Sequence, residues 1–300
     1  VSEEKRIIQF SKMRNKSYLS LIQNKQIGQT MTGLGELWTY FPHAFHVQCE
    51  NMLSPIQAFN DDKVLKLAID KRIKYGTYIN DSGMRKALKI TSGVQAVSNF
   101  RPTAAAAIYS FFNAETVWDM SCGYGGRLLG AFISNSVKHY IGTEPCEPTI
   151  TGLQKLRNHL VTIVSDFKIS LHQIGSECFK PEPSSLDLCF TSPPYFRTEQ
   201  YSNEATQSAI KFPEKQAWLE GFLAETMKNC YAGLKPGKYM LINIANVKAY
   251  PDLEQDCIKT AEKNGFILTD TLYYTLSKIM GTRKNRDKYK LEPVFVFQKT

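Results

Sequence analysis

The pattern of apolar and polar positions changes near residue 110. From residue 115 onward, short apolar runs typical of buried strands alternate with segments in which apolar residues recur every three or four positions. The expected strands are "TVWDMS", "HYIGTEP", "KISLHQIG", "LDLCFTSPPY", "GKYMLINIAN", "FILTDTLYYTL" and "EPVFVFQK". Such alternation predicts an α/β fold with a doubly wound, mainly parallel sheet. The two strands in succession at its end predict an antiparallel edge.

Residues 1–110 lack this alternation. They combine helical stretches such as "DDKVLKLAIDKRIKY" and "SGMRKALKI" with polar connections that contain Gly and Asn. We therefore expect a mainly helical N-terminal region over residues 1–95 and an α/β domain over residues 96–300.

Composition narrows the class of protein. No apolar run approaches the ~18 residues that a membrane span needs, and residues 1–30 carry charges where a signal peptide would be apolar. The seven cysteines are scattered and form no CxxC pair, which is typical of reduced thiols. These features predict a cytoplasmic protein with neither a secretion signal nor a membrane signal.

The net charge of +9 is unevenly distributed. Residues 1–110 hold 15 Lys and Arg against 8 Asp and Glu, whereas residues 111–300 hold 22 against 20. Most of the basic surplus therefore belongs to the first third of the chain. A surplus of this size favours a polyanionic partner such as a nucleic acid.

A glycine-rich turn follows the first expected strand of the α/β domain. In "DMSCGYGGR", Asp119 ends the strand, and Gly123, Gly125 and Gly126 allow a tight turn close to a ligand. Glu144 ends the next strand, at about the spacing from the glycine turn where a carboxylate is placed to accept hydrogen bonds from ribose hydroxyls. These two features predict a site for a dinucleotide or another adenosine compound.

The segment "SPPY", residues 192–195, ends the fourth strand. Two prolines lack N–H groups and fix φ, so they form a rigid, extended exit. The Ser192 hydroxyl and the Pro193 carbonyl would then face one amino group, and Tyr195 offers a flat face on which a base can stack.

Together these motifs make residues 95–300 resemble S-adenosylmethionine-dependent DNA methyltransferases that modify exocyclic amino groups. The resemblance implies a Rossmann-like sheet of seven strands, S-adenosyl-L-methionine as cofactor, DNA as partner and "SPPY" as the catalytic segment: Ser192, Pro193, Pro194 and Tyr195. "VSNFRPTAAAAIY" is similar to the segment that contacts the methionine end of the cofactor. The implied cofactor-binding residues are Phe100, Arg101, Pro102, Asp119, Ser121, Gly123, Gly125, Glu144 and Ser192.

The sequence departs from the family pattern in two places. Ser121 and Tyr124 flank the glycines where an aromatic-Gly-x-Gly is usual, and no long variable segment follows the catalytic motif or the last strand. The usual place for a target-recognition domain is therefore missing.

The implied reaction transfers a methyl group to the amino group of a flipped base. Serine at the first motif position favours N4 of cytosine slightly over N6 of adenine. The implied setting is the cytoplasm of a bacterial or phage-infected cell. Restriction-modification, protection of a phage genome and regulation all stay open as roles.

Candidate nucleic-acid contacts lie in three places. Tyr195 and Phe196 follow the catalytic turn, and the loop "TRKNRDKYK" carries Arg283, Lys284, Arg286, Lys288 and Lys290. The N-terminal region, a candidate for DNA recognition, contributes Arg72, Lys74, Tyr75, Arg85, Lys86 and Lys89. "EQYSNEATQ", with Tyr201 and Asn203, is expected to order over the flipped base.

Two other functions remain open. One is an RNA base amino-methyltransferase, and the other is a non-catalytic nucleic-acid-binding subunit of a methyltransferase complex. A second methyltransferase or a recognition subunit is a candidate partner, and the oligomeric state is not determined. His43, His46 and Cys49 are spaced by threes but lack a fourth ligand nearby, so we expect no metal site.

Overall fold

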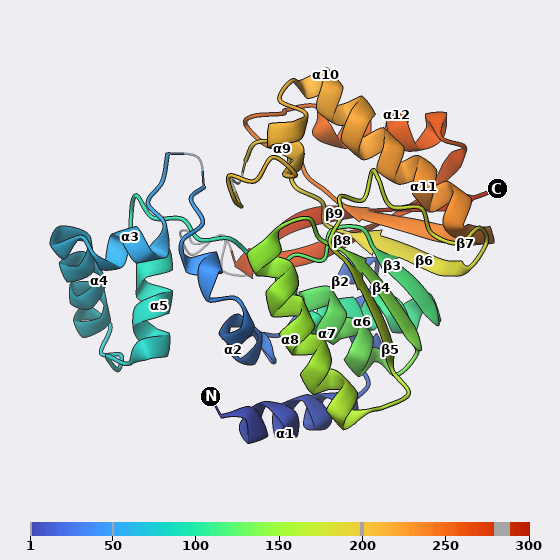
Figure 1. The fold of residues 1–300 in the computed structure, drawn as a ribbon. Coiled ribbons are helices and arrows are strands. Elements are labelled where there is room, and N and C mark those ends of the chain that lie inside the picture. The colour runs from blue at the N-terminus through green and yellow to red at the C-terminus, as the bar shows by residue number, and fades with distance from the viewer. Residues whose placement is uncertain (1, 50, 199–200, 279–288) are drawn as a thin grey trace.

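The computed structural model describes residues 2–49, 51–198, 201–278 and 289–300. Its strands are β1 (Ile22–Gln23), β2 (Gln26–Ile27), β3 (Thr116–Asp119), β4 (His139–Thr143), β5 (Lys168–His172), β6 (Leu186–Thr191), β7 (Leu234–Asn243), β8 (Phe266–Lys278) and β9 (Tyr289–Lys299). Across the described residues they form one sheet in the order β1-β2-β8-β9-β7-β6-β3-β4-β5 (Figure 1).

The sheet confirms the expected α/β class. Strands β3, β4, β5, β6 and β7 pair in parallel, while β9 lies antiparallel between β7 and β8. Seven of these strands match the expected sheet. The structure adds β1 and β2, two residues each, because β2 pairs with β8 through Gln26 and Ile27.

Helices cover both faces of the sheet. The α-helices are α1 (Glu3–Arg14), α2 (Leu34–Leu37), α3 (Pro55–Phe59), α4 (Asp62–Lys74), α5 (Asp81–Lys89), α6 (Pro102–Phe111), α7 (Gly126–Ser134), α8 (Glu147–Ile163), α9 (Ser208–Lys211), α10 (Lys215–Trp218), α11 (Glu225–Gly233) and α12 (Leu253–Lys263). The 3-10 turns are η1 (Leu19–Leu21), η2 (Trp38–Tyr40) and η3 (Pro42–Phe45), and the π-helical turn η4 (Leu219–Ala224) joins α10 to α11. Helices α6, α7 and α8 lie on one side of the sheet, and α10, α11 and α12 lie on the other (Figure 1).

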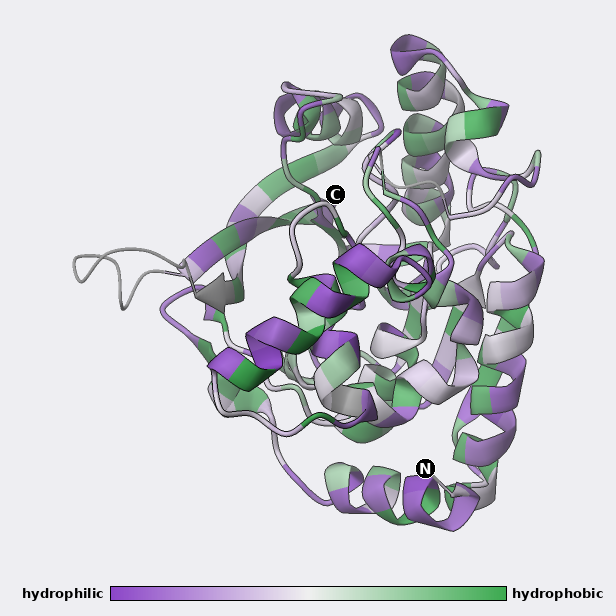
Figure 2. Ribbon diagram, turned by 90° about the vertical axis from the view of Figure 1, so that its left-hand side faces the viewer, coloured by the Kyte–Doolittle hydropathy of each residue, from purple (hydrophilic) through white to green (hydrophobic). Residues whose placement is uncertain are grey.

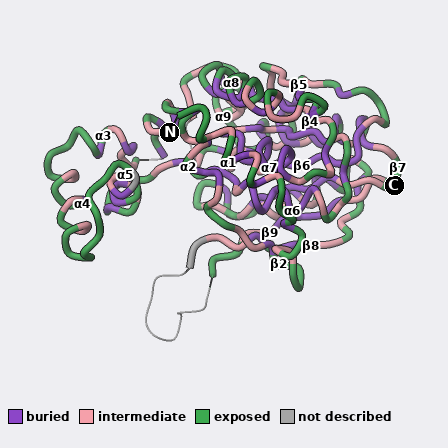
Figure 3. The backbone as a smooth tube through the Cα atoms, turned by 90° about the horizontal axis from the view of Figure 1, so that it is seen from below, coloured by how far each residue is buried: buried purple, intermediate pink, exposed green. Residues whose placement is uncertain are grey.

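Amphipathic patterning explains this layering. On α12, Leu253, Cys257 and Ala261 recur every four residues and are all buried. Figure 2 shows the same change between hydrophobic and hydrophilic positions along the helices. By contrast, β6 is buried at every position because helices cover both of its faces, as the buried centre of Figure 3 shows.

Residues 2–49 belong to the large core. Phe10, Met13, Ile27 and Phe41 are buried in the same cluster as α6 and α7. Residues 51–95, here called the helical lobe, instead have a small core of their own around Ala58, Ala68, Ala87 and Leu88. Residues 2–49 and residues 51–95 thus contribute to different hydrophobic clusters, and the expected division at residue 95 stays a prediction. The role of the N-terminal region in recognition stays a prediction.

No helix of the described residues is long and apolar enough to cross a membrane. All seven cysteines are free thiols, and only Cys178 among them is exposed.

Candidate functional site

A cavity of about 430 Å³ lies at the carboxyl ends of the parallel strands. Each strand contributes the residues that follow it, since these ends meet along one edge of the sheet. The cavity walls include Ser121 and Gly123 after β3, Glu144 after β4, Gly175–Glu177 after β5, Ser192–Tyr195 after β6, and Asn243 and Ala245–Val247 at and after the end of β7. The cavity thus brings the glycine turn, the expected ribose-binding acid and the SPPY segment together.

The glycine turn requires glycine at two positions for different reasons. Gly123 has φ +53° and lines the cavity, and a Cβ there would make one ordinary contact, with the Ser121 carbonyl oxygen at 3.9 Å. A Cβ on Gly126 would lie 1.9 Å from the Phe100 carbonyl oxygen. The Asn99 side chain joins the two segments, because its Oδ1 accepts from Gly126 N at 3.1 Å and its Nδ2 donates to the Tyr124 carbonyl at 2.8 Å. Gly125 (φ +73°) shapes the turn but does not line the cavity.

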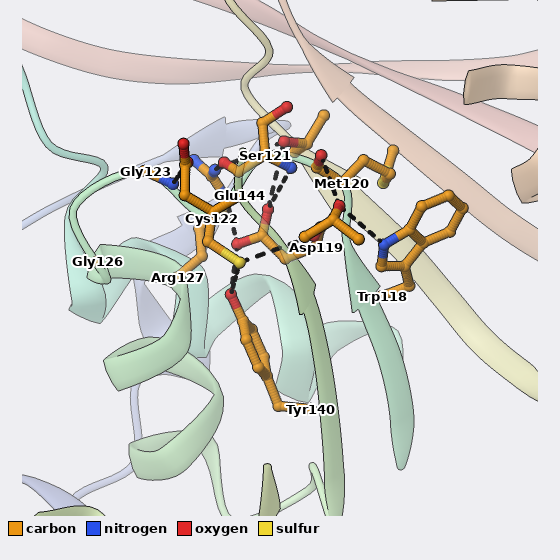
Figure 4. Close-up of polar contacts among 12 residues, drawn as sticks. Trp118, Asp119, Met120, Ser121, Cys122, Gly123, Gly126, Arg127, Tyr140 and Glu144 are labelled. Carbon is orange, nitrogen blue, oxygen red and sulfur yellow. Dashed lines mark hydrogen bonds and ion pairs between the residues drawn. The ribbon is translucent and has the colours of Figure 1, made fainter. Parts of the chain in front are cut away.

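Asp119 does not line the cavity; Figure 4 shows its contacts with the glycine turn and with Tyr140. It is fully buried and accepts from Arg127 Nε at 2.9 Å and from the Tyr140 hydroxyl at 2.6 Å. Its other oxygen faces Ser121 N and Thr191 Oγ1, both at 3.3 Å. The expected role of Asp119 as a direct cofactor ligand therefore does not match this placement. Its carboxylate holds Ser121 and Arg127, which do line the cavity.

Glu144 reaches the same turn from β4. Its Oε2 accepts from Gly123 N and its Oε1 from Cys146 N, each at 3.1 Å, as Figure 4 shows for Gly123. Burial raises the pKa of Glu144 to about 7, although both backbone hydrogen bonds act in the opposite direction. Carboxylate oxygens have more than one lone pair, so Glu144 can still accept hydrogen bonds from the hydroxyl groups of a ribose.

The segment before α6 forms another wall. Phe100 stacks on Tyr274 of β8 with ring centroids 4.5 Å apart, and the Tyr274 hydroxyl accepts from Arg101 N at 3.3 Å. Arg101 Nη1 donates to the Asn99 carbonyl at 2.7 Å, whereas its buried Nε has no hydrogen-bond partner among the described residues. Pro102 begins α6 and does not line the cavity.

The SPPY segment leaves β6 directly after Thr191 and lines the cavity along its whole length. The Tyr195 hydroxyl donates toward the Asn243 carbonyl at 3.3 Å and toward Glu292 Oε2 at 3.4 Å. These contacts anchor the ring from β7 and β9.

Phe196 does not fit its expected role in nucleic-acid binding. It is 7% exposed and packs edge-on against Trp218 and Tyr250, with centroids 5.8 and 6.0 Å away. Its left-handed backbone (φ +55°) turns the chain after Tyr195, which directs the Phe196 ring into the core on the α11 and α12 side. The position of Phe196 directly after the SPPY segment did not indicate where its side chain points, because successive residues in a turn point in different directions.

The wall residues that the sequence did not single out include Asn243, Tyr274 and Glu292, whereas Lys290, an expected nucleic-acid contact, also lines the cavity. Glu292 carried a usable signal, since it is the one acid in the apolar run "LEPVFVFQK" of β9. The positions of Asn243 and Tyr274 depend on pairing between strands far apart in sequence, which no local pattern reveals.

The other expected residues have mixed outcomes. Arg283, Lys284, Arg286 and Lys288 lie outside the described residues. Tyr201 lines the cavity with Thr206 and Gln207, so part of the expected lid adjoins the site. His43 Nε2 lies 2.9 Å from Thr149 Oγ1, and the described residues contain no group of three or more His, Cys, Asp or Glu placed to hold a metal ion.

The walls fit an adenosyl-methionine compound. Glu144 provides an acceptor for hydroxyl groups, and the bare Gly123 leaves room close to the backbone. The unpartnered Nε of Arg101 is a donor of the kind that a carboxylate accepts from.

Comparison with known proteins gives one match by family. Residues 186–300, which run from β6 to the end of β9, match a family described as DNA methylase, of the N6/N4 type. No curated protein sequence matches the chain.

Several solved structures with a similar course of the chain are methyltransferases. They include S-adenosylmethionine-dependent methyltransferases from Methanosarcina mazei (13% identity, 62% of this chain and 92% of the other, TM-score 0.40). Another is a 1,6-didemethyltoxoflavin-N1-methyltransferase from Burkholderia thailandensis (11% identity, 65% of this chain and 76% of the other, TM-score 0.43). A third is an O-methyltransferase from Thermotoga maritima (12% identity, 68% of this chain and 67% of the other, TM-score 0.44).

The family match covers the segment that contains the SPPY turn. Its position in the sheet and the shared cavity with Glu144 agree with that match. Residues 186–300 thus match the DNA methylase family of the N6/N4 type, which agrees with the resemblance of the chain to S-adenosylmethionine-dependent DNA amino-methyltransferases.

Proposed function

We propose that the protein methylates the exocyclic amino group of a base that is flipped out of DNA, with N4 of cytosine slightly favoured over N6 of adenine. The observation that carries this proposal is the shared cavity, in which Ser192–Tyr195 faces the same space as Glu144 and Gly123. A methyl donor and an amino acceptor can therefore meet in one enclosure. When bound, the cofactor supplies an electrophilic methyl group on a positively charged sulfur.

The residues of the SPPY segment orient the target. Ser192 Oγ and the Pro193 carbonyl accept hydrogen bonds from the amino group, so that the nitrogen lone pair points toward the cofactor side of the cavity. The ring of Tyr195 stacks on the base, and its anchored hydroxyl keeps the ring from rotating away. The chain thus contributes mainly orientation and preorganised polar groups.

The helical lobe is the proposed contact for the DNA backbone. It holds eight Lys and Arg against four Asp, and its C-terminal end leads into Gln95 and Ala96 of the cavity wall. Its exposed basic and aromatic side chains include Lys74, Tyr75, Tyr78, Arg85 and Lys86.

Two other lobe candidates have structural contacts instead. Arg72 donates to the Tyr78 carbonyl at 3.2 and 2.6 Å, so it holds the turn between α4 and α5. Lys89 Nζ lies 4.8 Å from the centre of the Trp38 ring. We therefore assign DNA contact to the exposed cations only.

A binding experiment tests the lobe. In one variant, Lys74, Arg85 and Lys86 are all changed to alanine. The slope of log affinity against log salt concentration, which is negative, should become less steep by about 0.9 for each lost phosphate contact. The matched control changes Lys228, Lys259 and Lys263, which lie on α11 and α12, to alanine. Equal slopes for the two triple variants in fluorescence anisotropy would remove the lobe from the proposal.

Activity is tested with methyl-labelled S-adenosylmethionine and mixed-sequence duplex DNA or RNA. We expect label in N4-methylcytosine or N6-methyladenine of DNA after digestion to nucleosides, and its loss in Ser192→Ala and Tyr195→Ala. Ser165→Ala, in an exposed turn before β5, is the matched control that keeps activity. Label in RNA alone would replace the substrate, and cofactor binding without any label would favour a non-catalytic subunit.

A further inference from the structure

The proposed function leaves the fate of one proton open, and the inference below rests on that function. When the amino nitrogen bonds to the methyl carbon, the carbon–sulfur bond breaks and its electron pair stays on sulfur, which becomes neutral. The nitrogen now carries the positive charge and must lose a proton. Neither the Ser192 hydroxyl nor the Pro193 carbonyl is basic enough to take it, because both are neutral oxygens that accept hydrogen bonds only.

A carboxylate is the ordinary acceptor for such a proton. Among the described residues that line the cavity, three are carboxylates: Glu144, Glu177 and Glu292. Glu144 accepts from two backbone N–H groups at the glycine turn, on the cofactor side. Glu177 is paired with Lys211 at 2.7 Å. Neither is therefore placed to take a proton at the SPPY turn.

Glu292 differs from both in position and pairing. It lies on β9 opposite Tyr274 of β8, and its Oε2 is 3.4 Å from the Tyr195 hydroxyl. Among the described residues, its ion-pair partner is Lys290 at 4.0 Å, a longer pair than that of Glu177. Its carboxylate thus stands beside the ring on which the base stacks.

We propose that Glu292 accepts the proton from the amino group of the target base, and so supplies the carboxylate that a serine at the first position of the SPPY segment lacks. In this role it is a catalytic residue, since it touches the reacting group.

Its surroundings suit proton transfer. The titratable groups that face it are Lys290 on β9, Tyr195 after β6, Tyr274 on β8 and Glu254 on α12. Burial raises the pKa of Glu292, while Lys290 and hydrogen bonds from Tyr195 and Asn243 act in the opposite direction. A raised pKa makes a carboxylate a stronger base, and kcat should then fall as the pH drops through that pKa.

The test compares Glu292→Gln with Glu262→Gln, an exposed position on α12. Glutamine keeps the volume and can still accept from Tyr195, but it cannot take a proton. We expect Glu292→Gln to lower kcat about 100-fold or more, with KM for DNA and affinity for S-adenosylmethionine changed by no more than about threefold. The acid limb of the wild-type pH profile should disappear in this variant only.

Tyr195→Phe separates proton transfer from the positioning of the ring. It removes the hydroxyl that Glu292 holds and should keep the acid limb. If Tyr195→Phe reproduces the loss and the flat profile of Glu292→Gln, Glu292 acts through Tyr195 and the assignment is wrong. An unchanged kcat in Glu292→Gln with active wild type would mean that water takes the proton, which refutes the assignment alone. No label from wild type would refute the function as well.

Discussion

Replacing Asp119 by asparagine separates the two roles that this residue could have. Asparagine has the same shape but no charge, so it removes the partner of Arg127, a guanidinium that is 5% exposed. Removing one partner of a buried ion pair costs about 3–5 kcal/mol, because the remaining charge is left without compensation. Hydrogen bonds from Arg127 to the Ser121 carbonyl and Thr191 Oγ1 persist. We therefore expect the lower end of that range, about 3 kcal/mol.

Urea unfolding of wild type and Asp119→Asn measures this loss. The further variant Asp119→Asn with Arg127→Met removes both charges and should be destabilised by less than the sum of the two single changes, with a coupling of about 1–3 kcal/mol. Titration calorimetry of the folded variant should find its affinity for S-adenosylmethionine within about threefold of wild type, since Asp119 does not line the cavity.

The opposite pattern would refute this reasoning. If Asp119→Asn lost more than about tenfold in cofactor affinity but less than about 1 kcal/mol in stability, Asp119 would be a direct ligand, as the sequence motif suggests. A loss in the double variant equal to the sum of the two single losses would show that Asp119 and Arg127 do not act as a pair.

Three further predictions concern the same site. Gly126→Ala should lower the free energy of unfolding by about 1–3 kcal/mol and weaken cofactor binding, because the new Cβ meets the Phe100 carbonyl. The control Gly35→Ala, with open space around it, should leave stability and cofactor affinity unchanged in calorimetry. The pKa of Glu144 in the folded protein is about 7, so the free energy of unfolding should decrease as the pH rises from about 4.5 to 7. Cofactor affinity should increase over the pH range around 7, where the carboxyl group becomes ionised. The variant Glu144→Gln should abolish both trends. Phe196→Ala should destabilise the fold by about 3–5 kcal/mol, while Tyr195→Ala should remove activity and leave the urea midpoint close to wild type. A stable, inactive Phe196→Ala would contradict its place in the core.

Much of the fold was predictable because strand and helix periods are local signals. The runs around Trp118, Tyr140 and Phe190 predicted β3, β4 and β6, and the SPPY segment followed β6 as expected. Pairing between distant segments was not predictable in this way. The short strands β1 and β2 carry no periodicity, and they join the sheet only because the segment 2–49 packs on the large core.

The site shows the same division. The positions of Glu144 and Ser192 in the cavity wall could be predicted, since each directly follows a strand at the ligand-binding edge. The side-chain directions of Asp119, at the end of β3, and of Phe196, in the turn after β6, could not be predicted, because both depend on the local backbone. Phe196 has a positive φ, and Asp119 points under the turn toward Tyr140.

The N-terminal segment also determines how β8 meets other molecules. Lys25 and Gln29, on either side of β2, add hydrogen bonds to the backbone of β8. The Lys25 carbonyl accepts from Tyr273 N at 2.7 Å, and Gln29 Nε2 donates to the Thr275 carbonyl at 2.6 Å. The long β8 would otherwise present unpaired backbone groups at the edge of the sheet, a template for a strand of another molecule. The added strands are themselves only two residues long, too short to extend the sheet further. Removing the chain up to and including Gln29 should therefore turn a protected edge into a site of self-association and aggregation.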